Sequence, residues 1–201
     1  DALQAKVAAA FKSYQKEAKA VSAARAKAAP LLSTAVSQAM QQLGMSGGRF
    51  EVALLPQDEP QSFGLESAEF LVAGHAGSTP RPLGKVASGG ELSRIALAIA
   101  VTTSQKNAGA GTLIFDEIDA GVGGAVAETV GRLMKQLGRR AQVLAVTHLP
   151  QVAACADHHF LVAKALKDGK TNSDVRPISG EARTAEIARM LGGERLSSTS
   201  L

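Results

Sequence analysis

Two short apolar runs with a helical stretch between them constrain the fold more than any other feature of this sequence. Residues 112–115 (Thr-Leu-Ile-Phe) and 142–146 (Gln-Val-Leu-Ala-Val) have the length and composition of buried strands, and residues 126–137 between them are predicted to be helical. A strand, a helix and a second strand in this order favour a right-handed crossover with parallel strands. The sequence therefore predicts an α/β fold with a buried parallel sheet.

Polar side chains follow each of these predicted strands. Asp116 and Glu117 come after the first, and Thr147 and His148 come after the second. Ligands of open α/β sheets bind at the carboxyl ends of the strands. A carboxylate there can hold Mg²⁺, a second one can polarise an attacking water, and an imidazole can donate a hydrogen bond to a terminal phosphate. The alternatives are a solvated acidic turn and a structural histidine.

A Ser-Gly-Gly-Glu stretch at residues 88–91 opens another predicted helix. Ser88, Gly89 and Gly90 precede Glu91, after which apolar residues recur at helical spacing. A helix N-terminus with bare glycines presents free N–H groups and the positive end of the helix dipole to an anion. The alternative is an ordinary serine N-cap followed by a tight turn.

The order of these elements resembles the second lobe of ABC-type ATPase heads. In that resemblance, the motifs are the signature loop at Ser88-Gly89-Gly90-Glu91, the Walker B strand at Leu113–Glu117, the D-loop aspartate at Asp119 and the switch histidine at His148. More narrowly, residues 81–94, 115–124, 146–153 and 186–193 are similar to the RecN family, bacterial DNA double-strand-break repair ATPases related to SMC proteins. The resemblance spans about residues 80–193.

The resemblance implies an ATPase that uses ATP and Mg²⁺. By position, Asp116 would hold the Mg²⁺ shell, Glu117 would be the general base, and His148 would contact the γ-phosphate. The signature loop, residues 88–91, would bind ATP held by a second head in a homodimer, and Asp119 would lie across that dimer interface. DNA is the implied partner of the full-length protein, and a cytoplasmic, nucleoid-associated location without a membrane partner is expected.

Neither of two lysine-containing stretches that imitate a P-loop fits the motif. Six residues rather than four separate Gly77 from Gly84-Lys85, and Lys164 stands where the first glycine before Gly169-Lys170-Thr171 belongs. Because the Walker A motif of the family precedes its coiled coil, the chain resembles the C-terminal half of a split head. Its expected partner is the N-terminal half of the same head, and the fragment alone is not expected to hydrolyse ATP.

The first 29 residues predict a basic helix. The chain has a formal net charge of +4, and residues 1–29 carry all of it. Apolar residues spaced by threes and fours favour either the end of a coiled-coil arm or an amphipathic helix on its own domain. The lysines could contact DNA phosphates or form a solvated face. No N-terminal cap signal precedes this helix, which suggests that the chain starts inside something longer.

Other segments complete the expected organisation. A second helix is predicted after Pro30, ending at Gly44, and residues 50–55 and 68–73 are predicted to form an antiparallel pair. A hairpin is predicted around Asp168-Gly169. The expected domains are a helical segment at 1–45, the end of a coiled-coil arm, and the C-terminal half of an ABC-type ATPase head at 46–201.

Three functions compete at this point. The first is the C-terminal half of the ATP-binding, ATP-hydrolysing head of a DNA repair ATPase, with ATP-dependent head dimerisation. The second is the nucleotide-binding subunit of an ABC transporter, although such a subunit normally has a P-loop upstream of the signature in the same domain. The third is a non-catalytic module that binds a partner through the basic helix.

Overall fold

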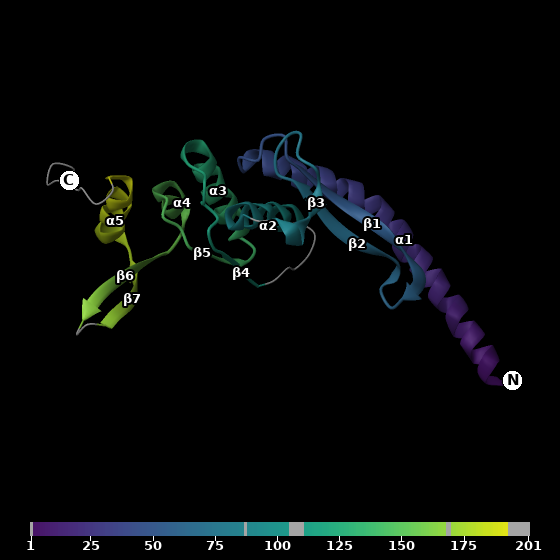
Figure 1. The fold of residues 1–201 in the computed structure, drawn as a ribbon. Coiled ribbons are helices and arrows are strands. Elements are labelled where there is room, and N and C mark those ends of the chain that lie inside the picture. The colour runs from purple at the N-terminus through teal and green to yellow at the C-terminus, as the bar shows by residue number, and fades with distance from the viewer. Residues whose placement is uncertain (1, 87, 105–110, 168–169, 193–201) are drawn as a thin grey trace. The chain divides into compact units, whose positions relative to one another are not determined.

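The structure, a computed structural model, describes residues 2–86, 88–104, 111–167 and 170–192. The chain divides into two compact units, an N-terminal unit of residues 1–87 and a C-terminal unit of residues 88–201. The N-terminal unit contains α1 (Ala2–Gln42), β1 (Arg49–Gln61), β2 (Gly64–Ala73), β3 (Arg81–Pro82) and a 3-10 turn (Leu83–Lys85) (Figure 1). The C-terminal unit contains α2 (Gly89–Thr103), β4 (Thr112–Phe115), α3 (Gly124–Leu137), β5 (Gln142–Ala145), α4 (Pro150–Cys155), β6 (His159–Lys167), β7 (Lys170–Ile178) and α5 (Gly180–Gly192).

Helix α1 is continuous through Pro30, so the prediction of two helices separated at this proline was wrong. A proline inside a helix removes one hydrogen bond and commonly costs about 3 kcal/mol. Here the carbonyl that loses its partner belongs to Ala26, and both Ala26 and Pro30 are exposed to water. Packing of the buried Ala29, Val36 and Met40 on either side keeps the helix intact.

The end of α1 was predicted correctly. Gly44 has φ +78°, the left-handed conformation that glycine adopts at low cost. The Met45 N–H donates to the Met40 carbonyl at 3.1 Å, and the Gly44 N–H donates to the Gln41 carbonyl at 3.4 Å. These two bonds form a Schellman motif, which turns the chain from α1 towards β1.

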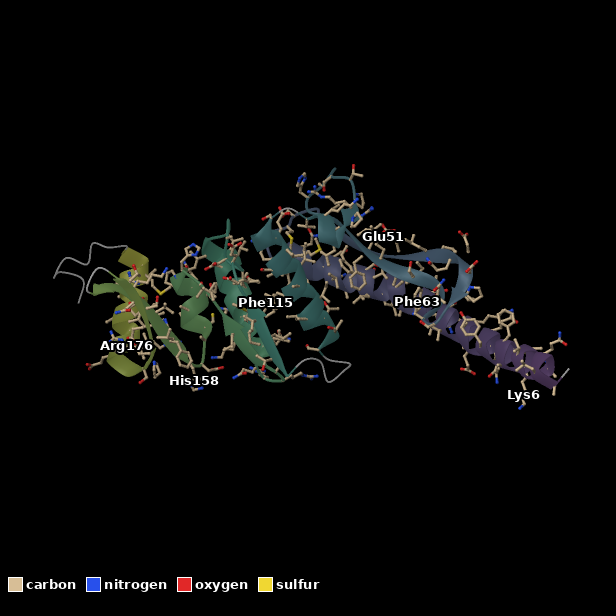
Figure 2. All side chains as sticks on the ribbon, turned by 60° about the horizontal axis from the view of Figure 1, so that its bottom comes forward. Lys6, Glu51, Phe63, Phe115, His158 and Arg176 are labelled. Carbon is tan, nitrogen blue, oxygen red and sulfur yellow. The ribbon has the colours of Figure 1, made fainter. Side chains whose placement is uncertain are left out.

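Strands β1 and β2 form the predicted antiparallel pair, but they are longer than expected. They lie beside α1 (Figure 1). The predicted strands covered residues 50–55 and 68–73, yet β1 runs to Gln61 and β2 starts at Gly64. Helix α1 holds this far end: the Tyr14 hydroxyl lies 2.8 Å from the Gln61 carbonyl oxygen, and Arg25 donates to the Phe63 carbonyl at 2.9 Å. Phe63 is labelled in Figure 2.

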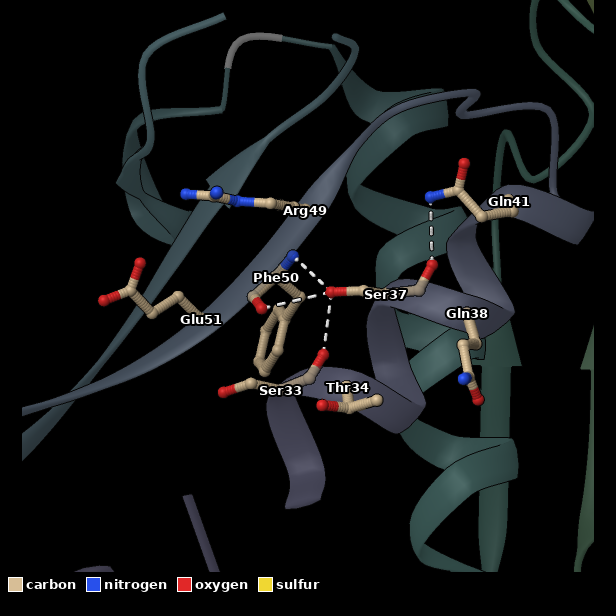
Figure 3. Close-up of a pocket in the computed structure, with 8 residues that line it drawn as sticks. All are labelled: Ser33, Thr34, Ser37, Gln38, Gln41, Arg49, Phe50 and Glu51. Carbon is tan, nitrogen blue, oxygen red and sulfur yellow. Dashed lines mark hydrogen bonds between the residues drawn. The ribbon is translucent and has the colours of Figure 1, made fainter. Parts of the chain in front are cut away.

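A ladder of polar side chains on α1 hydrogen-bonds the outer edge of β1. Ser33, Ser37 and Gln41 follow one another at four-residue spacing on one face of the helix. The Ser37 hydroxyl oxygen accepts from the Phe50 N–H at 2.9 Å (Figure 3). The Ser33 hydroxyl oxygen accepts from the Val52 N–H at 2.9 Å. These hydroxyl groups accept hydrogen bonds from N–H groups that an edge strand would otherwise leave free for pairing. Ser33 and Ser37 also line a pocket between α1 and β1 (Figure 3), which we therefore interpret as a structural contact.

Ser37→Ala is expected to lower the free energy of unfolding by about 1–3 kcal/mol, because the buried Phe50 N–H would lose its acceptor. Phe50 is only 2% exposed, so water cannot readily replace the hydroxyl. Urea denaturation of this chain checks the value. Thr34→Ala is the matched control, since Thr34 is exposed on the same turn of α1, and an equal loss in both variants would contradict the role of the Ser37 hydroxyl.

Glu66 on β2 makes the N-terminal unit sensitive to acid. Hydrogen bonding from Ser22 lowers the pKa of the Glu66 carboxyl, and a hydrogen bond and the charge of Arg25, 3.1 Å away, lower it further, while burial opposes them. A depressed carboxyl pKa contributes stability that is complete above the unfolded-state value of about 4.3 and is lost as pH falls through the folded-state pKa.

We therefore expect the unit to be destabilised below about pH 4 partly through protonation of Glu66. Glu66→Gln should be less stable than the natural chain at neutral pH and should converge with it in acid. Denaturation midpoints measured across this pH range test the expectation, and a constant difference between the two proteins at every pH would contradict it.

In the C-terminal unit, β4 and β5 are parallel and in register from Thr112 with Gln142 to Phe115 with Ala145, as predicted. The prediction that these strands are buried was wrong for one face of the sheet. Ile114 is 70% exposed, whereas its neighbour Phe115 is 5% exposed. Successive side chains of a strand point to opposite faces, and helices α2 and α3 bury apolar side chains such as Ile95 and Val130. One face of the sheet is thus packed and the other is open to solvent.

Strands β6 and β7 form the predicted antiparallel hairpin, with Phe160 opposite Pro177 and Val162 opposite Val175. The predicted turn at Asp168-Gly169 lies outside the described residues. Arg183 of α5 donates to the Ala156 carbonyl at 2.6 Å, just after α4. No helix in the described part of the chain is both long and apolar enough to span a membrane.

Candidate functional site

The parallel pairing of β4 and β5 brings their carboxyl ends to one edge of the sheet. Asp116 and Glu117 follow β4, and Thr147 and His148 follow β5. Asp116, Glu117 and His148 are exposed. The edge therefore presents two carboxylates and an imidazole to solvent, as the order of strands and motifs predicted.

The turn after β4 has an unusual backbone at Glu117. Among the residues that the structure describes, Glu117 is the one non-glycine residue with a positive φ, 54°. Such a conformation costs about 1–3 kcal/mol and persists where the surrounding structure enforces it. The Ala120 N–H closes the turn on the Glu117 carbonyl at 3.1 Å, and the Asp116 carboxylate accepts the Glu117 N–H at 2.9 Å.

The Glu117 side chain reaches the beginning of α2. A Cβ atom added at Gly89 would overlap the Glu117 Oε2 atom, so the missing side chain of Gly89 makes room for this carboxylate. A Cβ at Gly90 would lie 2.8 Å from the Ala120 Cβ. Gly90 thus allows α2 to approach the turn after β4, a reason for glycine at this position that does not involve a ligand, whereas the atom near Gly89 is the end of a flexible side chain.

Ser88 caps α2. Its backbone is extended, with φ −93° and ψ 119°, and its hydroxyl oxygen accepts the Glu91 N–H at 3.3 Å. This geometry is that of the ordinary serine N-cap that the sequence left open as an alternative. Ser88 and Gly89 are exposed, so the end of the helix remains accessible to an anion. Anion binding by residues 88–91 stays a prediction.

Arg94 is a residue of this region that the motifs did not reveal. It is 7% exposed, and its guanidinium donates to the Ala120 carbonyl at 2.8 Å. Burial lowers the pKa of the Arg94 guanidinium, and the negative charge of Glu91 opposes this shift. Helical spacing could have indicated the position, because Arg94 lies four residues after Gly90 and four before Ala98, both buried. Together with Ser93, which donates to the Asp116 carbonyl at 2.6 Å, it ties α2 to this turn.

Asp119 joins the turn after β4 to the turn after β5. Its Oδ2 atom accepts the N–H groups of His148 at 2.9 Å and Leu149 at 3.3 Å, and also accepts the Thr147 hydroxyl. The His148 Nδ1 atom lies 3.3 Å from the same oxygen. The Asp119 side chain is only 3% exposed, whereas that of His148 is 73% exposed. Its predicted place at a dimer interface stays a prediction, and the structure adds this contact within the chain.

These residues form a set with the chemistry for a nucleotide. Oxygen ligands such as Asp116 and Glu117 suit Mg²⁺, and an imidazole and the start of a helix suit phosphate groups. The structure brings Glu117 next to Gly89 and Asp119 next to His148. The Asp116 carboxylate contacts its own turn.

Comparison with known proteins shows what the chain as a whole is similar to. No family model matches the chain. The DNA repair protein RecN of Xylella fastidiosa (strain Temecula1) is 44% identical over 197 residues, which cover 97% of this chain and 35% of the relative. RecN of Vibrio cholerae is 41% identical over 202 residues, covering 100% of this chain and 36% of the relative.

Among solved structures, the Smc head domain with a coiled coil and joint from Pyrococcus yayanosii matches with a TM-score of 0.62 and 25% identity, over 92% of this chain and 33% of that one. The fold is thus that of an SMC-type ATPase head, which confirms the predicted class: an α/β, ABC-type P-loop NTPase head with an N-terminal helix. The chain spans about a third of the length of the curated relatives it matches. Over nearly all of its residues, the chain is thus similar to a segment of RecN proteins.

Proposed function

We propose that this chain is the C-terminal half of the ATP-binding and ATP-hydrolysing head of a DNA double-strand-break repair ATPase. The observation that carries the proposal is the common edge of β4 and β5, where Asp116, Glu117 and His148 are exposed together. Similarity to RecN proteins and the fold of an SMC head support it. The transporter alternative is not favoured, because the comparisons point to DNA repair proteins.

Each exposed side chain has a role in this proposal. Asp116 holds the Mg²⁺ shell through its carboxylate oxygens, and Glu117 accepts a proton from the attacking water. His148 donates a hydrogen bond to the γ-phosphate. Bound Mg²⁺ would neutralise charge that develops on the phosphate oxygens. The N-terminal half of the same head would supply the phosphate-binding loop that this sequence does not contain.

A second head completes the site in this proposal. Ser88, Gly89 and Gly90, with Glu91 at the first turn of α2, would bind the γ-phosphate of ATP held by the other head of a homodimer. The exposed Ser88 and Gly89 at the positive end of α2 support this. ATP would therefore close two heads, and hydrolysis would separate them. Asp119 at the dimer interface remains part of this prediction.

One lysine-rich face of α1 suits DNA. Lys12, Lys16, Lys19 and Lys27 are all exposed, and at 3.6 residues per turn they fall within about 80° of the helix circumference. Tyr14, Ser22, Arg25 and Ser33, which contact β1 and β2, centre on a direction about 130° away. The lysines are thus available to the phosphates of a duplex, which supports DNA as the partner. A nucleoid-associated, cytoplasmic location stays a prediction.

The proposal divides the chain by function into the end of an arm, residues 1–45, and a half-head, residues 46–201. The compact units of the structure meet at a different boundary, after residue 87, because β1 and β2 pack on α1. In the proposal, α1 continues into a coiled-coil arm. Exposed apolar residues near its start, such as Val7 (61%) and Phe11 (48%), suit a second helix.

Measurement of ATP turnover by the full-length protein, with and without duplex DNA, tests the proposed function. Hydrolysis that requires Mg²⁺ and responds to DNA is the expected result. Gel filtration with a non-hydrolysable ATP analogue should show a larger species than gel filtration without nucleotide. A full-length protein that has a P-loop but neither binds nor hydrolyses ATP would contradict the proposal and favour a non-catalytic interaction module.

A further inference from the structure

The buried Asp119 carboxylate determines how the turn at residues 147–149 is held. A carboxylate removed from water is costly unless hydrogen-bond donors surround it. Asp119 has such donors in the His148 and Leu149 N–H groups and the Thr147 hydroxyl. The dependence is mutual: without the carboxylate, the His148 N–H would lose its acceptor, and the Leu149 N–H would keep only the Thr147 hydroxyl oxygen, 3.0 Å away.

The imidazole of His148 also lies beside this oxygen. Nδ1 lies 3.3 Å from Asp119 Oδ2, which makes an ion pair when the ring is protonated. Because Nδ1 is the ring nitrogen beside the carboxylate, Nε2 is the one left for a ligand. Because the ring is 73% exposed while the carboxylate is 3% exposed, the contact restrains one side of the ring and leaves its other side accessible.

We propose that Asp119 is a positioning residue for His148 of its own chain, an inference that rests on the proposed ATPase function. It holds the turn at 147–149 and the ring so that Nε2 meets the terminal phosphate of ATP. A residue at the dimer interface can serve the site of its own chain or that of the opposite head, and these two roles make opposite predictions in mixtures of variants.

Nucleotide affinities of the full-length protein test the positioning role. Asp119→Ala should weaken binding of the analogue ATPγS by about 10-fold or more, the usual effect of losing a hydrogen bond to a charged group, and should leave ADP binding nearly unchanged. Asp119→Asn, which keeps an acceptor oxygen for the N–H groups, should restore part of the loss. Asp174→Ala, at an exposed position of β7, is the control and should behave as the natural protein.

A double-mutant cycle links this effect to the imidazole. His148→Ala should produce a similar loss of ATPγS binding, and Asp119→Ala combined with His148→Ala should lose little more than either variant alone, because residues that act as a unit are not additive. An equal weakening of ATPγS and ADP would show a merely structural role for Asp119. Additive losses would show that it does not act through His148. Either result would overturn the inference.

Mixing the two impaired variants shows whether Asp119 serves its own chain or the opposite head. If Asp119 positions His148 within its own chain, a mixture of Asp119→Ala and His148→Ala proteins contains no intact pair, and its ATP turnover at limiting ATP should stay as low as that of either variant alone. If Asp119 serves the opposite head, each mixed dimer has one intact site, and recovered turnover would contradict the inference. Natural protein that binds neither nucleotide would contradict the proposed function itself. Natural protein that hydrolyses ATP, with ATPγS and ADP affinities that Asp119→Ala leaves unchanged, would contradict the positioning role alone.

Discussion

Glu117→Gln in the full-length protein is expected to slow ATP hydrolysis by about 10²–10⁴-fold, the usual contribution of a general base. Glutamine has nearly the shape of glutamate but cannot accept the proton of the attacking water. ATP binding and head dimerisation should persist, because the other proposed contacts to ATP, from His148 and Asp116, remain. The variant should therefore accumulate as an ATP-bound dimer.

Single-turnover hydrolysis and gel filtration with ATP measure the two halves of this expectation. Glu181→Gln is the matched control, since Glu181 is exposed in the first turn of α5 and is remote in sequence from the motifs. Unchanged turnover in Glu117→Gln would exclude Glu117 as the base. Loss of ATP binding together with turnover would instead indicate that its left-handed backbone and its place beside Gly89 support the fold of the site.

Replacing Lys12, Lys16, Lys19 and Lys27 by glutamine should weaken duplex DNA binding and make it less dependent on salt. Each lysine–phosphate contact contributes about 0.9 to the slope of log affinity against log salt, so the loss of four contacts lowers that slope by about 3–4. The effect should be similar for unrelated DNA sequences, because phosphate contacts carry no base information.

Fluorescence anisotropy with a labelled duplex at several salt concentrations measures the slope. The control replaces four exposed cationic residues elsewhere by glutamine, which changes the net charge by the same amount: Arg49, Arg139, Lys164 and Arg176. An equal loss in both variants would show a general effect of charge. A slope unchanged by the α1 variant would place DNA binding elsewhere in the protein.

Local patterns predicted much of the C-terminal unit. The parallel pairing of β4 and β5 follows from two short apolar runs joined by a helix, and the capping of α2 follows from Ser88 before two glycines. Pro30 was misjudged because its local cost is about 3 kcal/mol, which packing of Ala29, Val36 and Met40 can offset. Such packing is visible only when the partners of α1 are known.

The sequence by itself determined the order of the motifs, the type of most elements and the residues exposed at the strand ends, because these depend on spacing and on short-range backbone preferences. Only the tertiary structure decided which groups meet. Asp119 binds the turn at His148, 29 residues away, and Arg94 reaches the Ala120 carbonyl, 26 residues away. One face of β4 stays exposed at Ile114. Contacts between distant residues depend on how whole elements pack, and no local spacing encodes that packing.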